Sequence, residues 1–147
     1  MGGRKSLLTS VIALAVLIGV GAFMWQLWQR SNSEAAQVRS FVRAFMQARL
    51  AGDDTRARAF LTADFHRQYV EQANASLIGP ADPHFHSCRI DSLKLDSTGV
   101  WTARVRIEVH QSGFRPVGWQ VETIRVVPVD GGYRISAIDP TPLAARS

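Results

Sequence analysis

Three residues near the middle of the chain have side chains that could bind a metal ion. His84, His86 and Cys88 are separated by one residue each, so on a β-strand all three would point to one face. Imidazole nitrogen and thiolate sulfur are ligands that zinc and copper accept. A fourth ligand is not apparent beside them, and Pro83 delays the start of the strand to about Phe85. We therefore predict no metal site and no cofactor, and expect a strand edge that carries two polar histidines.

A second group of residues could perform acid–base chemistry. Asp64, His66 and Tyr69 lie on or near one predicted helix, and His66 and Tyr69 are three residues apart, a spacing that places two side chains on one helix face. Such a pair could act as a base and a hydrogen-bond donor. Alternatively, Tyr69 packs with Phe65 beneath a sheet while Asp64 and His66 face water. We favour this second interpretation and expect none of the three residues to be catalytic.

A third candidate is a contact surface rather than a chemical site. Phe114 and Arg115 lie in the predicted loop between two long strands. An exposed aromatic side chain at a hairpin tip is typical of an interaction surface. We predict that these two residues contact a partner.

The segment that positions everything after it is apolar and lies near the N-terminus. Residues 6–29 contain no charged side chain, and a helix of that length spans the roughly 30 Å hydrocarbon core of a bilayer. Trp25, Trp28 and Arg30 lie at its end, where interfacial aromatic and basic residues gather. The sequence therefore predicts a single-pass transmembrane helix over residues 6–29 behind a short cytoplasmic tail, residues 1–5.

A cleaved secretory signal is the alternative interpretation of this segment. Arg4 and Lys5 would form its basic region, and Val20-Gly21-Ala22 would be an acceptable small-residue cleavage site. The apolar run continues to Trp28, however, beyond the usual length of the apolar region of a signal peptide. We predict an uncleaved signal-anchor, with the basic tail inside and the remaining chain outside the cytoplasm.

The charge distribution and the cysteine content limit which classes of function the chain can have. The net charge of the chain is +5, but residues 1–30 hold three of the 17 basic and none of the 12 acidic residues. Residues 31–147 therefore carry 14 basic and 12 acidic residues, interspersed rather than in a block, and we predict no nucleic-acid binding. The chain has one cysteine, which excludes an intrachain disulfide.

Helix signals dominate the first half of the exposed part. After a linker over residues 30–33, Ser31 and Glu34 form a possible capping box at the start of a helix. Gly52 would end that helix, one of the two aspartates after it would cap the next, and Thr62 would cap a third. The first helix carries one apolar stripe at helical spacing, made of Val38, Phe41, Val42, Phe45, Met46 and Leu50.

Strand signals dominate the second half. Apolar and polar residues alternate from Trp101 to His110, with the apolar ones at odd positions, which predicts one buried face. In residues 118–129 the apolar positions change from odd to even, so we expect a bulge near Glu122-Thr123. Asp130-Gly131-Gly132 predicts a hairpin turn. The strands are predicted over residues 85–95, 101–110, 118–129 and 133–138. Helices followed by an antiparallel sheet indicate an α+β fold.

This order of elements resembles the NTF2-like (cystatin-like α+β cone) superfamily. The likeness is carried by residues 42–54, by residues 59–62 with Tyr69, and by residues 122–138, including the Gly-Gly turn. It covers residues 34–139 and leaves a C-terminal tail, residues 140–147. Tyr133 stands where such domains often have tryptophan. The resemblance implies helices packed on a curved antiparallel sheet, and it implies little about function, since the superfamily includes enzymes, transport adaptors and assembly domains.

Anchor and domain together suggest a class of function. We expect a single-pass, extracytoplasmic protein of the bacterial envelope that acts as a non-catalytic binding or assembly module. The alternatives are a membrane-tethered enzyme similar to SnoaL or ketosteroid isomerase, and a small component of a type IV secretion-like envelope complex. The expected partners are the bilayer through residues 6–29, a protein of the envelope and, as an alternative, a second copy of the chain.

Overall fold

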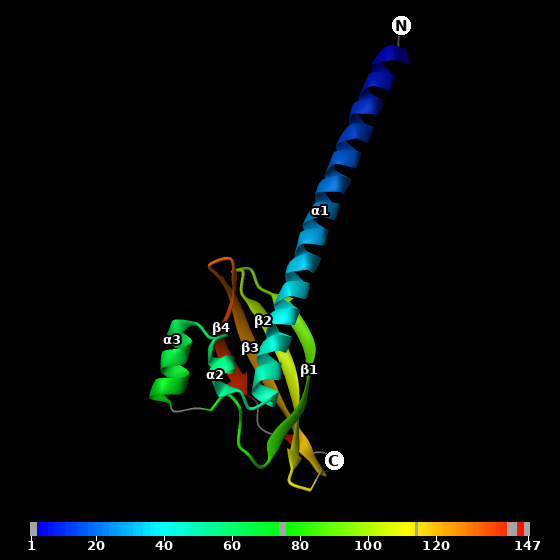
Figure 1. The fold of residues 1–147 in the computed structure, drawn as a ribbon. Helices are drawn as coiled ribbons and strands as arrows, with labels where there is room; N and C mark the ends of the chain where they lie inside the picture. The colour runs from blue at the N-terminus through cyan, green and yellow to red at the C-terminus, as the bar shows by residue number, and fades with distance from the viewer. Residues whose placement is uncertain (1–2, 74–75, 114, 141–143, 146–147) are drawn as a thin grey trace. The chain divides into compact units, whose positions relative to one another are not determined.

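The computed structural model describes residues 3–73, 76–113, 115–140 and 144–145. It divides the chain into two units, Met1–Ala36 and Gln37–Ser147. Helix α1 (Gly3–Leu50) begins in the first unit and ends in the second. The fold is α+β: the second unit contains the end of α1, three short helical segments and an antiparallel sheet (Figure 1).

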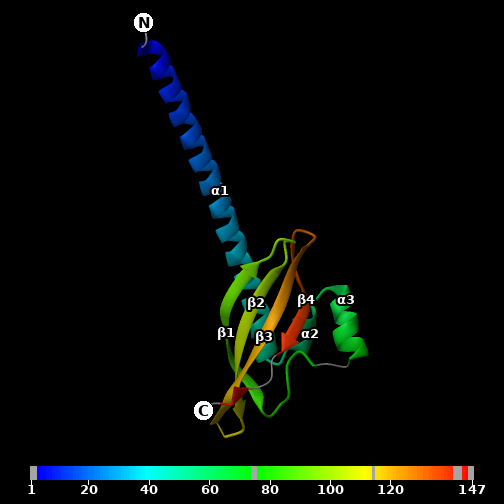
Figure 2. The ribbon, with the colours of Figure 1, turned by 180° about the vertical axis from the view of Figure 1, so that it is seen from behind.

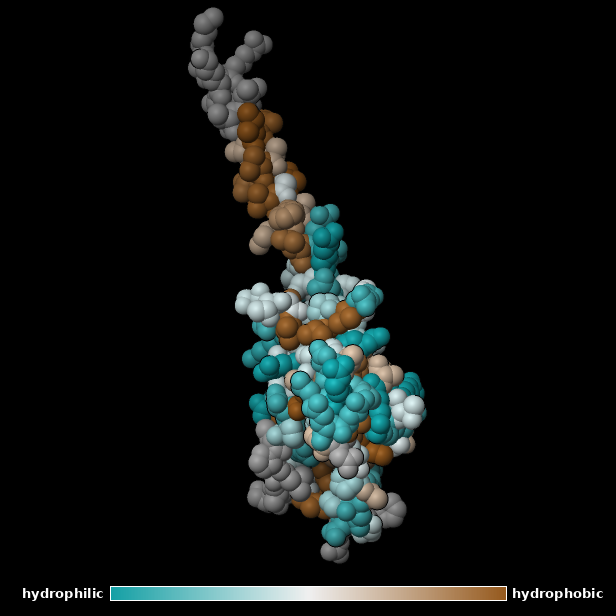
Figure 3. Space-filling view, turned by 90° about the vertical axis from the view of Figure 1, so that its left-hand side faces the viewer, coloured by the Kyte–Doolittle hydropathy of each residue, from teal (hydrophilic) through white to brown (hydrophobic). Residues whose placement is uncertain are grey.

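From Val11 onward, the large apolar side chains of the first unit are exposed rather than packed within the unit. Leu17 is 69% exposed and Trp25 is 58% exposed, and apolar residues gather along the middle of this helix in the space-filling view (Figure 3). A soluble surface rarely leaves so many large apolar side chains in water. Among the described residues this helix is long and apolar enough to cross a membrane, features that a secretory signal sequence shares.

The predicted start of a helix at Ser31, after a linker, is wrong. Residues 30–33 are helical, and α1 continues through Ser31 and Glu34 without an N-terminus there. A capping side chain acts where backbone N–H groups lack partners, and in the middle of a helix those groups are already bonded to carbonyls of the preceding turn. The segment contains neither glycine nor proline, so nothing in its sequence interrupts the helix.

The end of α1 and the caps of the two helices after it follow their predicted positions. Gly52 has a φ of +71°, and the hydrogen bonds Asp53 N to Ala48 O and Gly52 N to Arg49 O close a Schellman motif at the end of α1. Asp53 then caps α2 (Asp54–Arg58) by accepting from Arg56 N at 3.0 Å. Thr62 caps α3 (Ala63–Phe65) by accepting from Phe65 N at 3.2 Å. A π-helix, η1 (His66–Gln72), follows directly.

The sheet is an antiparallel meander. Its strands are β1 (His84–Leu95), β2 (Trp101–Gln111), β3 (Arg115–Val129), β4 (Gly132–Pro140) and β5 (Ala144–Ala145). The spatial order is β1-β2-β3-β4, and β5 pairs with β3 at Gly118 and Trp119. Part of the predicted C-terminal tail therefore belongs to the sheet. The turn between β3 and β4 has positive φ at Asp130 and Gly131, as a two-residue hairpin requires.

The core lies between one face of the sheet and the end of α1. The end of α1 lies over this inner face, and no helix among the described residues lies over the outer face (Figures 1 and 2). The bridge between Leu61 and Ile135 joins the chain between α2 and α3 to β4. Fully or almost fully buried core side chains are Val38, Val42, Phe45, Met46, Trp101, Ala103, Val105, Ile107, Val109, Ile124, Val126, Ile135 and Ile138. The predicted helix stripe and the predicted inward register of β2 are confirmed.

The predicted bulge in β3 is wrong. Pairing between β2 and β3 runs without a shift from Trp101–Val126 to Val109–Gly118, so Val105 lies opposite Glu122. Even-numbered residues of β3 therefore point inward over this whole stretch, and Glu122 is 97% buried, with an exposed fraction of 3%. Trp119 and Val121 consequently lie on the outer face, because successive side chains alternate between the two faces.

We expect residues 31–147 to fold without the N-terminal unit as a soluble α+β domain, and Phe45→Asp to destabilise that domain severely. Phe45 is fully buried and its ring lies 5.8 Å from that of Phe60. The substitution removes a large apolar side chain and buries an unpaired charge, which costs about 4 kcal/mol or more. Gln47→Asp, at an exposed position two residues further on, is the matched control. Urea unfolding followed by tryptophan fluorescence measures both; equal midpoints would contradict the assignment of the helix face.

Candidate functional site

The residues predicted as acid–base candidates are not assembled into one cluster. Asp64 is exposed. The His66 Nδ1 atom lies 3.4 Å from Glu71 Oε1, five residues along, as expected for neighbours in a π-helix. Tyr69 instead packs on Phe65, with ring centroids 5.0 Å apart. The same-face argument assumed α-helical winding, and η1 does not have it.

The interior contains a charged pair that sequence analysis missed. Arg49, near the end of α1, and Glu122, on β3, are each 3% exposed. Two parallel contacts join them, Nη1 to Oε2 at 2.5 Å and Nη2 to Oε1 at 3.1 Å. The third guanidinium nitrogen of Arg49, Nε, donates to the Leu77 carbonyl, and the ring centroids of Phe45 and Phe85 lie 5.4 Å and 5.2 Å from the guanidinium carbon. The pair is bidentate, desolvated and enclosed by aromatic rings.

This pair also affects Tyr69. Burial raises the pKa of the Tyr69 phenol; the positive charge of Arg49 opposes this rise, and the negative charge of Glu122 adds to it. Both oxygens of the Glu122 carboxylate are engaged by the Arg49 guanidinium, which leaves this carboxylate poorly placed to act as a general base. The first consequence of the pair is therefore structural: it connects α1, β3 and the segment at Leu77.

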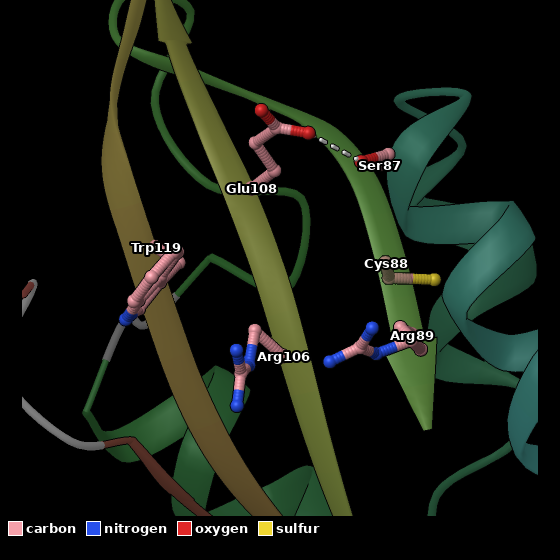
Figure 4. Close-up of a pocket in the computed structure, with 6 residues that line it drawn as sticks. All are labelled: Ser87, Cys88, Arg89, Arg106, Glu108 and Trp119. Atoms are coloured by element: carbon pink, nitrogen blue, oxygen red, sulfur yellow. Dashed lines mark hydrogen bonds between the residues drawn. The ribbon is translucent and has the colours of Figure 1, made fainter. Parts of the chain in front are cut away.

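The candidate metal ligands do not share one face, as the sequence predicted they would. Pairing between β1 and β2 shifts between Phe85 and Ser87, so a bulge interrupts the alternation. Cys88 lies opposite the buried Ile107, and its sulfur points toward the helix (Figure 4). Burial raises the pKa of this thiol, an effect that the charges of Arg49 and Arg43 oppose.

The two candidate histidines, His84 and His86, lie beside His110 and not beside Cys88 as predicted. His84 pairs across the strands with His110, and the ring of His86 stacks on that of His110 at a centroid distance of 3.8 Å. His110 comes 24 residues after His86 in the chain, and the register of two strands brings it there.

The predicted contact residues fall at the edge of what is described: Phe114 lies outside the described residues, and for Arg115 only the backbone, at the start of β3, is described.

The outer face of the sheet carries a hollow of about 300 Å³ (Figure 4). Trp119 lies at one side of it, with the Arg106 guanidinium carbon 5.0 Å from the ring centroid. Asp91 binds Arg106 at 3.0 Å and Arg89 at 2.9 Å, and Ser87 Oγ donates to Glu108 Oε2 at 3.0 Å. The residues that line the hollow are Ser87, Cys88, Arg89, Arg106, Glu108 and Trp119.

Ion pairs hold this hollow in place. A second register shift, between Ile90 and Ser92, lets Asp91 reach two arginines on the outer face. Partial burial would raise the pKa of the Asp91 carboxyl, but the hydrogen bond from Arg89 and the charge of Arg106 outweigh it and lower the pKa. Arg106 is thereby fixed over Trp119, and a cation over an aromatic ring is a common element of recognition surfaces.

No protein-family model matches this chain, and neither a curated protein nor a solved structure matches it. The class of the protein therefore follows from the fold itself. It is an α+β chain in which a long apolar N-terminal helix precedes an antiparallel sheet with one uncovered face.

The buried pair gives a prediction about stability. Glu122→Gln leaves Arg49 desolvated without its counter-charge, and breaking a buried pair in this way costs about 3–5 kcal/mol. The double substitution Arg49→Met with Glu122→Leu removes both charges and should recover most of that loss. Asp139→Asn, at an exposed carboxylate on β4, is the control. Urea unfolding of the parent, Glu122→Gln, Arg49→Met, Glu122→Leu, the double variant and the control tests this; if the double variant were as unstable as the sum of Arg49→Met and Glu122→Leu, the two residues would not be coupled.

Proposed function

We propose that this protein is a membrane-anchored, non-catalytic binding or assembly module with an NTF2-like domain held outside the cytoplasm. The α1 helix supplies the anchor, and the sheet with its covering helices forms the domain. The order of elements, with helices first and then a meander whose inner face is covered, supports the assignment to the NTF2-like fold. In this proposal, the partner is a protein of the bacterial envelope.

The observation that carries the proposal is the position of Trp119. Its side chain lies on the uncovered face, fixed beside Arg106 in a hollow of about 300 Å³. Tryptophan and arginine are the residue types most enriched among those that dominate binding energy at protein interfaces. The inner face offers less surface to a partner, since large side chains and the Arg49–Glu122 pair occupy it.

A membrane-tethered enzyme remains the competing proposal, and Tyr69 is the residue on which it depends. Tyr69 is close enough to Arg49 and Glu122 for their charges to influence its phenol. An enzyme of this kind would need the interior, whereas a binding module would need the outer face. Substitutions on the two faces therefore separate the two functions.

The anchor proposal makes its own prediction. We expect residues 1–30 to be retained in the mature protein and the domain to be digested by protease added outside intact spheroplasts. The reason is that the apolar run continues to Trp28 without a polar region after Val20-Gly21-Ala22. N-terminal sequencing and protease accessibility measure the two parts. A mature N-terminus at Phe23 would contradict retention, and a protected domain would contradict the orientation.

Partner binding should depend on the outer face. A photo-crosslinking residue placed at Val121 in cells should capture a specific partner, and Trp119→Ala should weaken that capture by about tenfold or more, as loss of a dominant interface residue does. Val129→Ala removes an exposed apolar side chain elsewhere and is the matched control. The triple substitution Asp64→Asn, His66→Gln and Tyr69→Phe should leave capture and the cellular role unchanged. Loss of the role in a folded triple variant would favour the enzyme.

A further inference from the structure

Three of the four histidines in the chain gather at one corner of the sheet. His84 lies opposite His110 on the neighbouring strand, and their ring centroids are 6.3 Å apart. His86 lies 6.5 Å from His84 and is stacked on His110 at 3.8 Å. Only His66 is elsewhere, on η1.

The bulge in β1 creates this cluster. Phe85 pairs with Val109 and Ser87 pairs with Glu108, which leaves His86 as the unpaired residue between them. The side chain of such an extra residue points in a different direction from the one that regular strand alternation would give it. His86 therefore reaches His110, and Cys88, which the sequence pattern had grouped with the histidines, points away from them toward α1.

A carboxylate completes the cluster. Glu108 Oε1 lies 3.2 Å from His110 Nε2, while Oε2 of the same carboxylate accepts a hydrogen bond from Ser87. The His110 Nε2 atom is buried and makes no hydrogen bond to any described residue. A buried ring nitrogen that makes no well-aligned hydrogen bond is unusual, and its polar neighbour here is Glu108 Oε1.

We propose that His84, His86, His110 and Glu108 form a binding site for a divalent transition metal ion of the zinc and copper type. Imidazole and carboxylate are ligands that these ions accept. In a tetrahedral site with bonds of about 2.0–2.1 Å, two ligand atoms are about 3.3 Å apart. The separation of 3.2 Å between His110 Nε2 and Glu108 Oε1 already matches that spacing. This inference stands apart from the proposed partner binding.

Binding requires the rings to rotate. As the side chains now lie, no group of three His, Cys, Asp or Glu residues among those described surrounds one point. Imidazoles that share a tetrahedral ion have centroids about 5 Å apart, so the stacked pair must open and His84 must move inward by about 1 Å. His84 and His86 are exposed, and exposed side chains change rotamer rapidly. The more buried His110 stays in place beside Glu108.

Calorimetric titration of the full chain with Zn²⁺ tests the site, using protein in detergent micelles and without a polyhistidine tag. We expect one Zn²⁺ per chain. His86→Ala and His84→Ala, both at exposed positions, should each weaken binding by about tenfold or more, because even residues behind metal ligands have effects of that size. His66→Ala is the matched control and should bind as the unaltered protein does. Circular dichroism verifies that each variant is folded.

Two further measurements separate this site from others. Co²⁺ bound in place of Zn²⁺ should give visible absorption typical of tetrahedral nitrogen and oxygen ligands, and Glu108→Gln should change that spectrum. Cys88→Ser should leave affinity and spectrum unchanged. Zn²⁺ affinity that is the same in His84→Ala and His86→Ala as in the unaltered protein would overturn the proposal, as would an equal loss in His66→Ala or a thiolate absorption band that Cys88→Ser removes.

Discussion

The buried pair of Arg49 and Glu122 is the interaction on which the arrangement of the second unit depends. Removing two charges from water costs several kcal/mol per ion, and only bidentate geometry with further hydrogen bonds offsets that cost. The pair therefore fixes the end of α1 against the middle of β3, and Arg49 Nε also holds the carbonyl of Leu77. Because Glu122 must point inward, every second residue of β3 points inward with it. Trp119 and Val121 are thereby placed on the outer face.

The two faces of the sheet consequently have different roles. The inner face is filled by the apolar stripe of α1, the odd-numbered residues of β2 and the charged pair. The outer face retains a tryptophan, a stacked arginine and a network of ion pairs centred on Asp91. A side chain as large as tryptophan stabilises a fold most when it is buried in the core. Its location on the uncovered face, at a position fixed by Glu122, is the main reason to look for a partner there.

The sequence predicted those features that depend on neighbouring residues. Gly52, Asp53 and Thr62 act within one helical turn, and the Asp130-Gly131 turn depends on two residues, so each could be identified from local chemistry. The inward direction of the Glu122 side chain could not be predicted, because its partner Arg49 is 73 residues away in the chain. Without that partner, the alternation of apolar and polar residues places a carboxylate on the exposed face of a strand. The histidine cluster was missed for a similar reason: a bulge at His86 and the β1–β2 register together bring in His110.

The outer hollow and the histidine cluster share one carboxylate. Glu108 accepts from Ser87 through one oxygen and faces His110 through the other, so one side chain belongs to both features. Both features lie on β1 and β2, and β1 is an edge strand of the sheet. Edge strands have unpaired backbone groups that invite unwanted pairing, and bulges and charged side chains discourage it. β1 has two register shifts and the pair Arg89–Asp91. The irregularities that protect this edge are therefore also the ones that bring Asp91 to Arg106 and His86 to His110.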